Sequence, residues 1–204
     1  MNRRLTRVAI AVLMALTLAG VAGGGPPFRA KPFEFDPNNT GIVLAAWVTH
    51  EGLPDAGNSN HALLLVKDGP TVAFASSGAT IQGVSGITLT ELGYDVRADG
   101  HCGAGAPRFN VTMSNDGLHF IGCAASPVTS TLTDPQGNVW LRKRLTAASL
   151  ASAVIAFPPI TPFSGNVVSI SIVFDEGTDQ GVGFTHLDNI DIDGVLIGKP
   201  GNAS

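Results

Sequence analysis

The sequence is poor in charged and aromatic residues, and each shortage narrows the range of functions. Only 14% of the 204 residues are charged, and 12 basic residues stand against 16 acidic ones, which gives a net charge of −4. Nucleic-acid binding depends on basic side chains that neutralise phosphates, so this balance does not suit a nucleic-acid partner. Aromatic residues make up 6% of the chain, with two tryptophans and one tyrosine among them. Few side chains are therefore available to stack on sugar rings.

Long apolar runs are also scarce, and the one that exists lies at the N-terminus. Three arginines precede an unbroken, weakly apolar stretch at 8–22. A spanning helix needs about 20 apolar residues, whereas a charged start followed by a shorter apolar run is typical of a secretory signal peptide. We expect a signal peptide, a linker rich in glycine and proline, and a single domain (residues 1–22, 23–32 and 33–204).

Removal of the signal peptide would leave a secreted or extracytoplasmic protein that is not inserted in a membrane. It would also take away three arginines and no acid, which changes the net charge from −4 to −7. An acidic protein of this kind does not suit an anionic membrane surface either.

Short apolar runs separated by turn residues fill the rest of the chain, which has 25 glycines and 13 prolines. The runs lie at 42–48, 61–67, 71–76, 86–97, 108–114, 118–122, 138–145, 166–175, 186–194 and 195–198. Strands of this length and spacing predict an all-β fold, an antiparallel β-sandwich of jelly-roll type. At most one short helix is expected near 147–157, capped by Thr146, with a strand through 153–157 as the alternative.

The chain has only two cysteines, Cys102 and Cys123. A strand that ends at 97, a loop at 98–106 and a hairpin after it would bring both cysteines to the same end of a sheet. Because secretion supplies an oxidising compartment, we predict a disulfide between them. A zinc site with His101 and His119 is an alternative, although no Cys-x-x-Cys spacing supports it. A catalytic thiol is disfavoured because the second cysteine is within reach.

Two groups of side chains are candidate ligand contacts. Trp140, Arg142 and Arg144 alternate along one predicted strand and therefore share a face, where they could stack on a sugar or hold an anionic glycan. The alternative is a solvated face on which the aromatic ring and the guanidinium groups contact each other. His101 and Arg108 flank the loop at 98–106, and loops at the end of a sandwich often carry binding sites.

Recognisable catalytic motifs are missing. The sequence has no Gly-x-Ser-x-Gly and no His-Glu-x-x-His, and its five histidines are scattered. A glycosidase would need two carboxylates across a cleft, and sequence alone does not select such a pair among sixteen acids. The "GAGAP" run at 103–107 has the composition of an anion-binding nest but lacks the strand–loop–helix context of a phosphate loop. The sequence leans towards a protein that is not an enzyme.

One segment resembles a known class of domain. The stretch "GFTHLDNIDIDG" (183–194), after "VVSISIVFDEGTD" (167–179), is similar to the closing strands of jelly-roll carbohydrate-binding modules. The resemblance implies that Asp188 helps to bind a structural calcium ion, together with Glu34 or Asp36. A carboxylate that accepts hydrogen bonds from turn amides without any metal is the alternative for Asp188.

The resemblance and the missing catalytic motifs together predict a non-catalytic binding domain, with a polysaccharide or another glycan at or outside the cell surface as its partner. Two alternatives stay open. One is a jelly-roll hydrolase or lyase that acts on glycans, and the other is a structural protein of an envelope or matrix.

Overall fold

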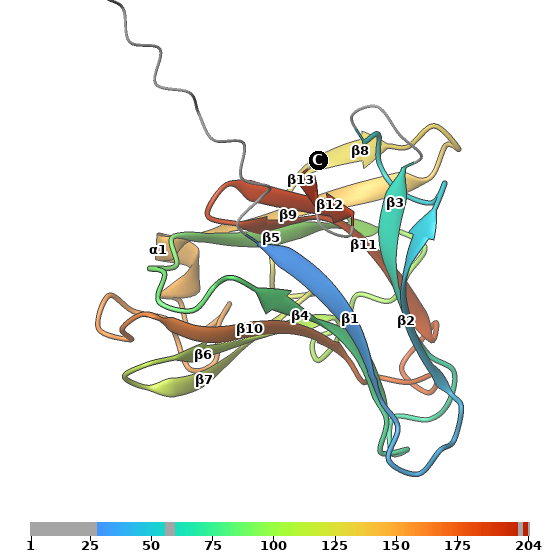
Figure 1. Cartoon of the computed structure of the whole chain (residues 1–204), viewed down its shortest axis with the longest axis horizontal. Coiled ribbons are helices and arrows are strands. Elements are labelled where there is room, and N and C mark those ends of the chain that lie inside the picture. The colour runs from blue at the N-terminus through green and yellow to red at the C-terminus, as the bar shows by residue number, and fades with distance from the viewer. Residues whose placement is uncertain (1–27, 56–59, 200–201, 204) are drawn as a thin grey trace, which may run out of the picture.

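Two antiparallel sheets contain almost all the regular structure in the computed structural model, which describes residues 28–55, 60–199 and 202–203. The first sheet has five strands in the order β1 (Arg29–Phe35), β4 (Ser76–Gln82), β10 (Val167–Phe174), β6 (Arg108–Met113) and β7 (Gly117–Gly122). The second has eight strands. Six follow the order β13 (Asn202–Ala203), β12 (Val195–Lys199), β11 (Phe184–Ile192), β5 (Glu91–Arg97), β9 (Val139–Thr146) and β8 (Val128–Thr133), while β3 (His61–Lys67) pairs with β11 and β2 (Val43–Thr49) pairs with β3. The predicted β-sandwich is confirmed (Figure 1).

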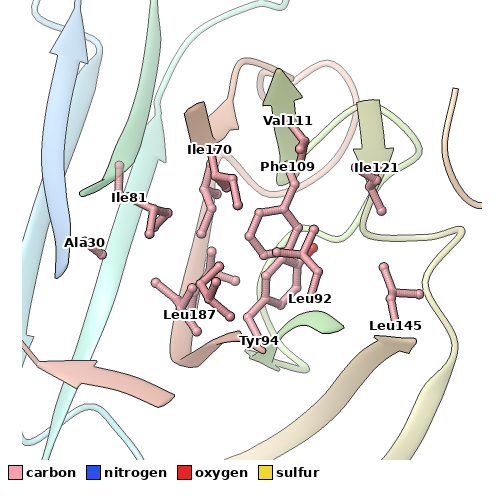
Figure 2. Packing of buried hydrophobic residues seen from close by; sticks show 14 of the residues in the cluster. Ala30, Ile81, Leu92, Tyr94, Phe109, Val111, Ile121, Leu145, Ile170 and Leu187 are labelled. Carbon is pink, nitrogen blue, oxygen red and sulfur yellow. The ribbon is translucent and has the colours of Figure 1, made fainter. Parts of the chain in front are cut away.

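The core lies between the sheets and follows from alternation along the strands. Leu92, Tyr94 and Val96 of β5 are buried, as are Phe109 and Val111 of β6 in the opposite sheet. The rings of Tyr94 and Phe109 stack with centroids 5.1 Å apart (Figure 2). Burying a large apolar side chain stabilises the fold by about 1.5–3 kcal/mol, so this two-sided layer supplies the main favourable contribution.

A β-bulge in β11 determines which of its side chains lie on the outer face of the second sheet. The register against β5 shifts between Asp188 and Asp191, and Asn189 takes a positive φ of 44° at this point. The extra residue turns Ile190 into the core and places both Asp188 and Asp191 on the outer face. The bulge also divides β11 into a first half that pairs with β3 and a second half that pairs with β12.

Several local predictions need correction. The helix is a single turn, α1 (Ala147–Leu150), which Thr146 caps as predicted but which ends well before 157. The alternative strand through 153–157 does not form either, because this segment folds into turns. The apolar run at 71–76 is a loop up to its last residue, and β4 begins only at Ser76.

The edges of the domain differ as well. β1 already begins at Arg29, before the start of the domain that the sequence placed at 33. No helix in the part of the chain described here is long and apolar enough to cross a membrane.

The predicted disulfide is confirmed. Cys102 and Cys123 are bonded, with their Cα atoms 5.1 Å apart. The loop after β5 and the end of β7 meet at one end of the sandwich, as the chain directions require. Closing a loop of this size stabilises the fold by about 3 kcal/mol in the chain-entropy model. The bond also removes both thiols from the zinc site and the catalytic role that were the alternatives.

Candidate functional site

The outer face of the second sheet carries several buried polar side chains, among them Asp95, Arg97, His186, Asp188 and Asp191. β5 and β9 pair so that Arg97 lies opposite Trp140, Asp95 opposite Arg142 and Gly93 opposite Arg144. Their neighbours in sequence are core residues, so alternation turns all of these side chains away from the core. The prediction that Trp140, Arg142 and Arg144 share a face is therefore correct.

The prediction that Trp140 contacts a ligand is wrong, because this residue is fully buried. Its ring packs against Leu53 and Ala62, and its Nε1–H donates to Asp134 Oδ2 at 2.9 Å. Leu53 belongs to the connection between β2 and β3, which crosses over this part of the sheet. Alternation places Trp140 on the outer face but carries no information about a loop that covers it.

The two arginines beside Trp140 are held by acids of the protein itself. Arg142 donates from Nε and Nη2 to the two carboxylate oxygens of Asp95, both at 3.0 Å. Arg144 pairs with Asp95 at 3.3 Å and with Asp191 at 2.8 Å. Asp95 also accepts from Asn189 Nδ2 at 2.9 Å and has no exposed surface. Both guanidinium groups are therefore engaged by carboxylates of this chain.

The second predicted contact region, beside the disulfide, is also closed by internal pairs. Two backbone N–H groups of the 103–107 run donate to Glu176 at 3.0 and 3.2 Å, and His101 Nε2 lies 2.6 Å from the same carboxylate. Arg108 makes a bidentate ion pair with Asp175. The anion nest suggested by the sequence thus exists, but it holds a carboxylate of this chain. The guanidinium group of Arg108 and the Nε2 atom of His101 are therefore already engaged by groups of this chain.

Each residue that the resemblance implies for calcium accepts hydrogen bonds from this chain. Asp188 accepts from the backbone N–H groups of Leu53 and Asn189, at 2.8 and 2.6 Å. Glu34 accepts from a backbone N–H of β2, while Asp36 accepts from its own turn. Within the described residues no three His, Cys, Asp or Glu side chains are grouped so as to hold a metal ion. The two backbone hydrogen bonds of Asp188 are those that the alternative without a metal requires.

A shallow groove of about 490 Å³ lies on the outer face where β3, β5 and β11 adjoin. We call it the outer groove. Apolar and polar side chains line it together, namely Leu64, Val66, Asp68, Arg97, Gly183, Phe184 and His186. Pairing of β3 with β11 sets Leu64 beside His186 and Val66 beside Phe184, so much of this lining follows directly from the register of these strands.

The outer groove contains a buried polar side chain, His186, whose pKa and hydrogen bonding are unusual. Burial, together with the positive charge of Arg97, lowers the pKa of His186 to about 4, so its imidazole is neutral at pH 7. Its Nδ1 atom is buried and has no hydrogen-bond partner among the described residues. Buried polar atoms are nearly always paired, so this nitrogen is an exception.

Asp188 lies two residues further along β11, and its pKa shifts upward instead of downward. Burial raises its pKa to about 8, and the charges of Asp55 and Asp95 act in the same direction, while its two backbone hydrogen bonds oppose them. At neutral pH the folded protein therefore keeps a proton on Asp188 that the unfolded chain, with an ordinary value near 3.8, has lost.

Replacing Asp188 with asparagine is expected to change the pH dependence of stability. In the wild type, the folded state binds the Asp188 proton more tightly than the unfolded state does, so stability falls as the pH rises from about 4 to about 8. His186 has the opposite sign, because its lowered pKa makes stability rise between about 4 and 6.5. In Asp188→Asn, stability should still rise between pH 4 and 6.5, but it should no longer fall between pH 6.5 and 8.

Urea unfolding of the two proteins at a series of pH values measures this effect. The difference between the two curves isolates Asp188, since all other groups contribute to both. The variant should gain stability relative to the wild type as the pH rises from 6.5 to 8, and the difference between the two proteins should stay constant above that range. Parallel curves between pH 6.5 and 8 would show that Asp188 is already ionised in the folded state.

Sequence reasoning missed the outer groove, although a signal was present. Alternation in "HALLLVK" and "GFTHL" puts Leu64, Val66, Phe184 and His186 on one face of their strands. These strands are more than a hundred residues apart in sequence, and only their pairing joins the two faces. Arg97 was read as the end of a strand, and no motif marked it.

Comparison of the chain with protein-family models, with curated proteins and with solved structures finds no match.

Proposed function

We propose that the protein is a non-catalytic binding protein that takes a carbohydrate in the outer groove. The volume of about 490 Å³ lies within the range of roughly 300–1,000 Å³ that is common for small-ligand sites. The groove is open along one side, which suits a ligand that continues beyond it, such as one end or one segment of a glycan.

The chemistry of the outer groove complements a sugar ring. Leu64, Val66 and the half-buried Phe184 offer an apolar floor for the C–H face of the ring. Arg97 and His186 lie beside this floor and can bond hydroxyl groups. A mixed site of this kind binds a molecule with one apolar face and several hydroxyls better than it binds a fully apolar one.

The grouping of apolar side chains with Arg97 and the neutral imidazole of His186 along one groove is the observation that carries the proposal. A neutral imidazole nitrogen either donates or accepts according to its tautomer, and a sugar hydroxyl does both. The predicted secretion of the protein agrees with a glycan partner outside the cell.

A melting-temperature screen against a panel of soluble oligosaccharides tests this function. A ligand present at a hundred times its Kd stabilises the folded state by about 2.7 kcal/mol, which raises the melting temperature by several degrees. Phe184→Ala removes the aromatic floor and should weaken binding at least tenfold. Phe163→Ala is the matched control, because Phe163 is 86% exposed and does not line the outer groove.

The same samples separate binding from catalysis. Chromatography of each stabilising oligosaccharide after prolonged incubation should recover it uncut, and cleavage would favour the alternative of a glycan hydrolase or lyase. No melting shift with any member of the panel would contradict the proposed function. Equal losses of affinity in Phe184→Ala and Phe163→Ala would place the ligand elsewhere.

A further inference from the structure

We propose that the outer groove selects uncharged sugars over sugars that carry a carboxylate, and that Glu51 and Asp99 determine this specificity. The inference rests on the proposed function, since it concerns the ligand of the same groove. It differs from the expectation of an anionic glycan at Trp140, Arg142 and Arg144 on the same outer face.

Beside the outer groove, the cation of Arg97 is paired with two carboxylates that are more exposed than it is. Arg97 is the only basic side chain among the described residues that line it. Its Nη1 donates to Glu51 at 2.6 Å and its Nε donates to Asp99 at 2.7 Å. The side chain of Arg97 is 9% exposed, whereas those of Glu51 and Asp99 are 46% and 55% exposed. A ligand that approaches from solvent therefore meets the two carboxylates before it meets the cation.

No other group in the outer groove compensates for this negative charge. Asp68 adds a third carboxylate at the rim, and His186 is neutral. Arg97 together with its partners and Asp68 sums to a formal charge of −2. A carboxylate on the ligand would be repelled at close range, where an interaction between unit charges is screened least.

Uncharged sugars are not repelled by these carboxylates, and their hydroxyl groups can bond to them. Their hydroxyls donate hydrogen bonds to carboxylate oxygens, and the exposed oxygens of Glu51 and Asp99 are acceptors only. A second hollow of about 320 Å³, lined in part by Asp99 and Asn138, shares Arg97 with the outer groove. A ligand longer than one sugar unit that extends from the groove into this hollow therefore passes over Arg97 and Asp99, and Glu51 is bonded to the same guanidinium group.

Matched pairs of oligosaccharides test this inference on the full protein. Each neutral oligomer of glucose, galactose or mannose is compared with the uronate oligomer of the same ring stereochemistry and length. For the neutral sugar that binds, its uronate should bind at least tenfold more weakly at low salt. Raising the salt concentration should strengthen uronate binding and leave neutral binding unchanged, because only the former involves charge repulsion.

Glu51→Gln is the variant that connects the effect to the mouth of the groove. It keeps an acceptor for Arg97 but removes one negative charge, so the preference for the neutral sugar should narrow several-fold. Glu34→Gln, on β1 of the opposite sheet, is the control and should leave the preference unchanged. The salt series on the wild type gives an independent result if the variant folds poorly.

The outcomes separate the inference from the function on which it rests. A uronate that binds as tightly as its neutral partner, or more tightly, would overturn the inference and leave the proposed function standing. Binding by neither class would overturn both. An unchanged preference in Glu51→Gln, with no salt effect on uronate binding, would show that Glu51 and Asp99 do not set the specificity.

Discussion

Replacing Asp95 with alanine is expected to lower the free energy of unfolding by about 3 kcal/mol. The carboxylate is completely buried and accepts hydrogen bonds from Arg142 and Asn189, while Arg144 lies 3.3 Å away. Removing one member of a buried ion pair costs about 3–5 kcal/mol, because the remaining charges lose their partner. The lower end of this range applies, since Arg142 is one-third exposed and Arg144 keeps Asp191.

Urea denaturation of the wild type and the variant measures the loss, with the slope against urea checked for two-state behaviour. Asp68→Ala is the matched control, because this carboxylate is exposed on the same side of the sheet and should cost less than about 0.5 kcal/mol. The loss of stability in Asp95→Asn should lie between those of Asp95→Ala and Asp68→Ala, because asparagine keeps the shape of the side chain and one acceptor. A loss in Asp95→Ala no larger than that of Asp68→Ala would show that water replaces the carboxylate without cost.

Replacing Lys67 with methionine should cause a loss of similar size, about 3 kcal/mol. Lys67 is 1% exposed, and its ammonium group donates to the backbone carbonyls of Thr71, Ala73 and Asp175, at 3.0, 2.8 and 2.7 Å. Methionine keeps the apolar stem but leaves three carbonyls without their donor. Each unpaired buried group costs about 1–3 kcal/mol, and access of water from the adjoining hollow reduces the total.

Lys143→Met provides the comparison that tests this explanation. Lys143 is also buried, but its ammonium group donates to one carbonyl, that of Ser126, at 2.7 Å. Chemical denaturation should therefore give a loss near 1 kcal/mol for this variant, and an exposed replacement, Lys31→Met, should have almost no effect. Equal losses at 67 and 143 would mean that burial of the charge, and not the number of carbonyls, decides the cost.

The Lys67 contacts also explain a local error in the sequence reading. The apolar run at 71–76 has the composition of a strand, yet two carbonyls of this segment turn inward to the ammonium group and Val72 is left 88% exposed. The hydrogen bonds of Lys67, which lies outside this run, thus outweigh the preference of residues 71–76 for a strand. The strand that follows, β4, has the small and weakly patterned sequence "SSGATIQ" and was not predicted.

Periodicity and chain direction were sufficient for the features that depend on near neighbours. Alternation placed Trp140, Arg142 and Arg144 on one face, and Thr146 was correctly identified as a helix cap. The order of strand, loop and hairpin was enough to bring Cys102 and Cys123 to the same end of a sheet. These predictions hold because each depends on the geometry of one strand, one turn or one hairpin.

The sequence by itself determined that this protein is a β-sandwich with one disulfide, since patterns of period two, turn residues and cysteine placement are local and additive. Only the tertiary structure decided which outer-face residues are accessible. Leu53 covers Trp140, Asp95 neutralises the arginines beside it, and the pairing of β3 with β11 builds the outer groove beside Arg97. Alternation assigns a side chain to a face of a sheet, but accessibility depends on what the rest of the chain places over that face.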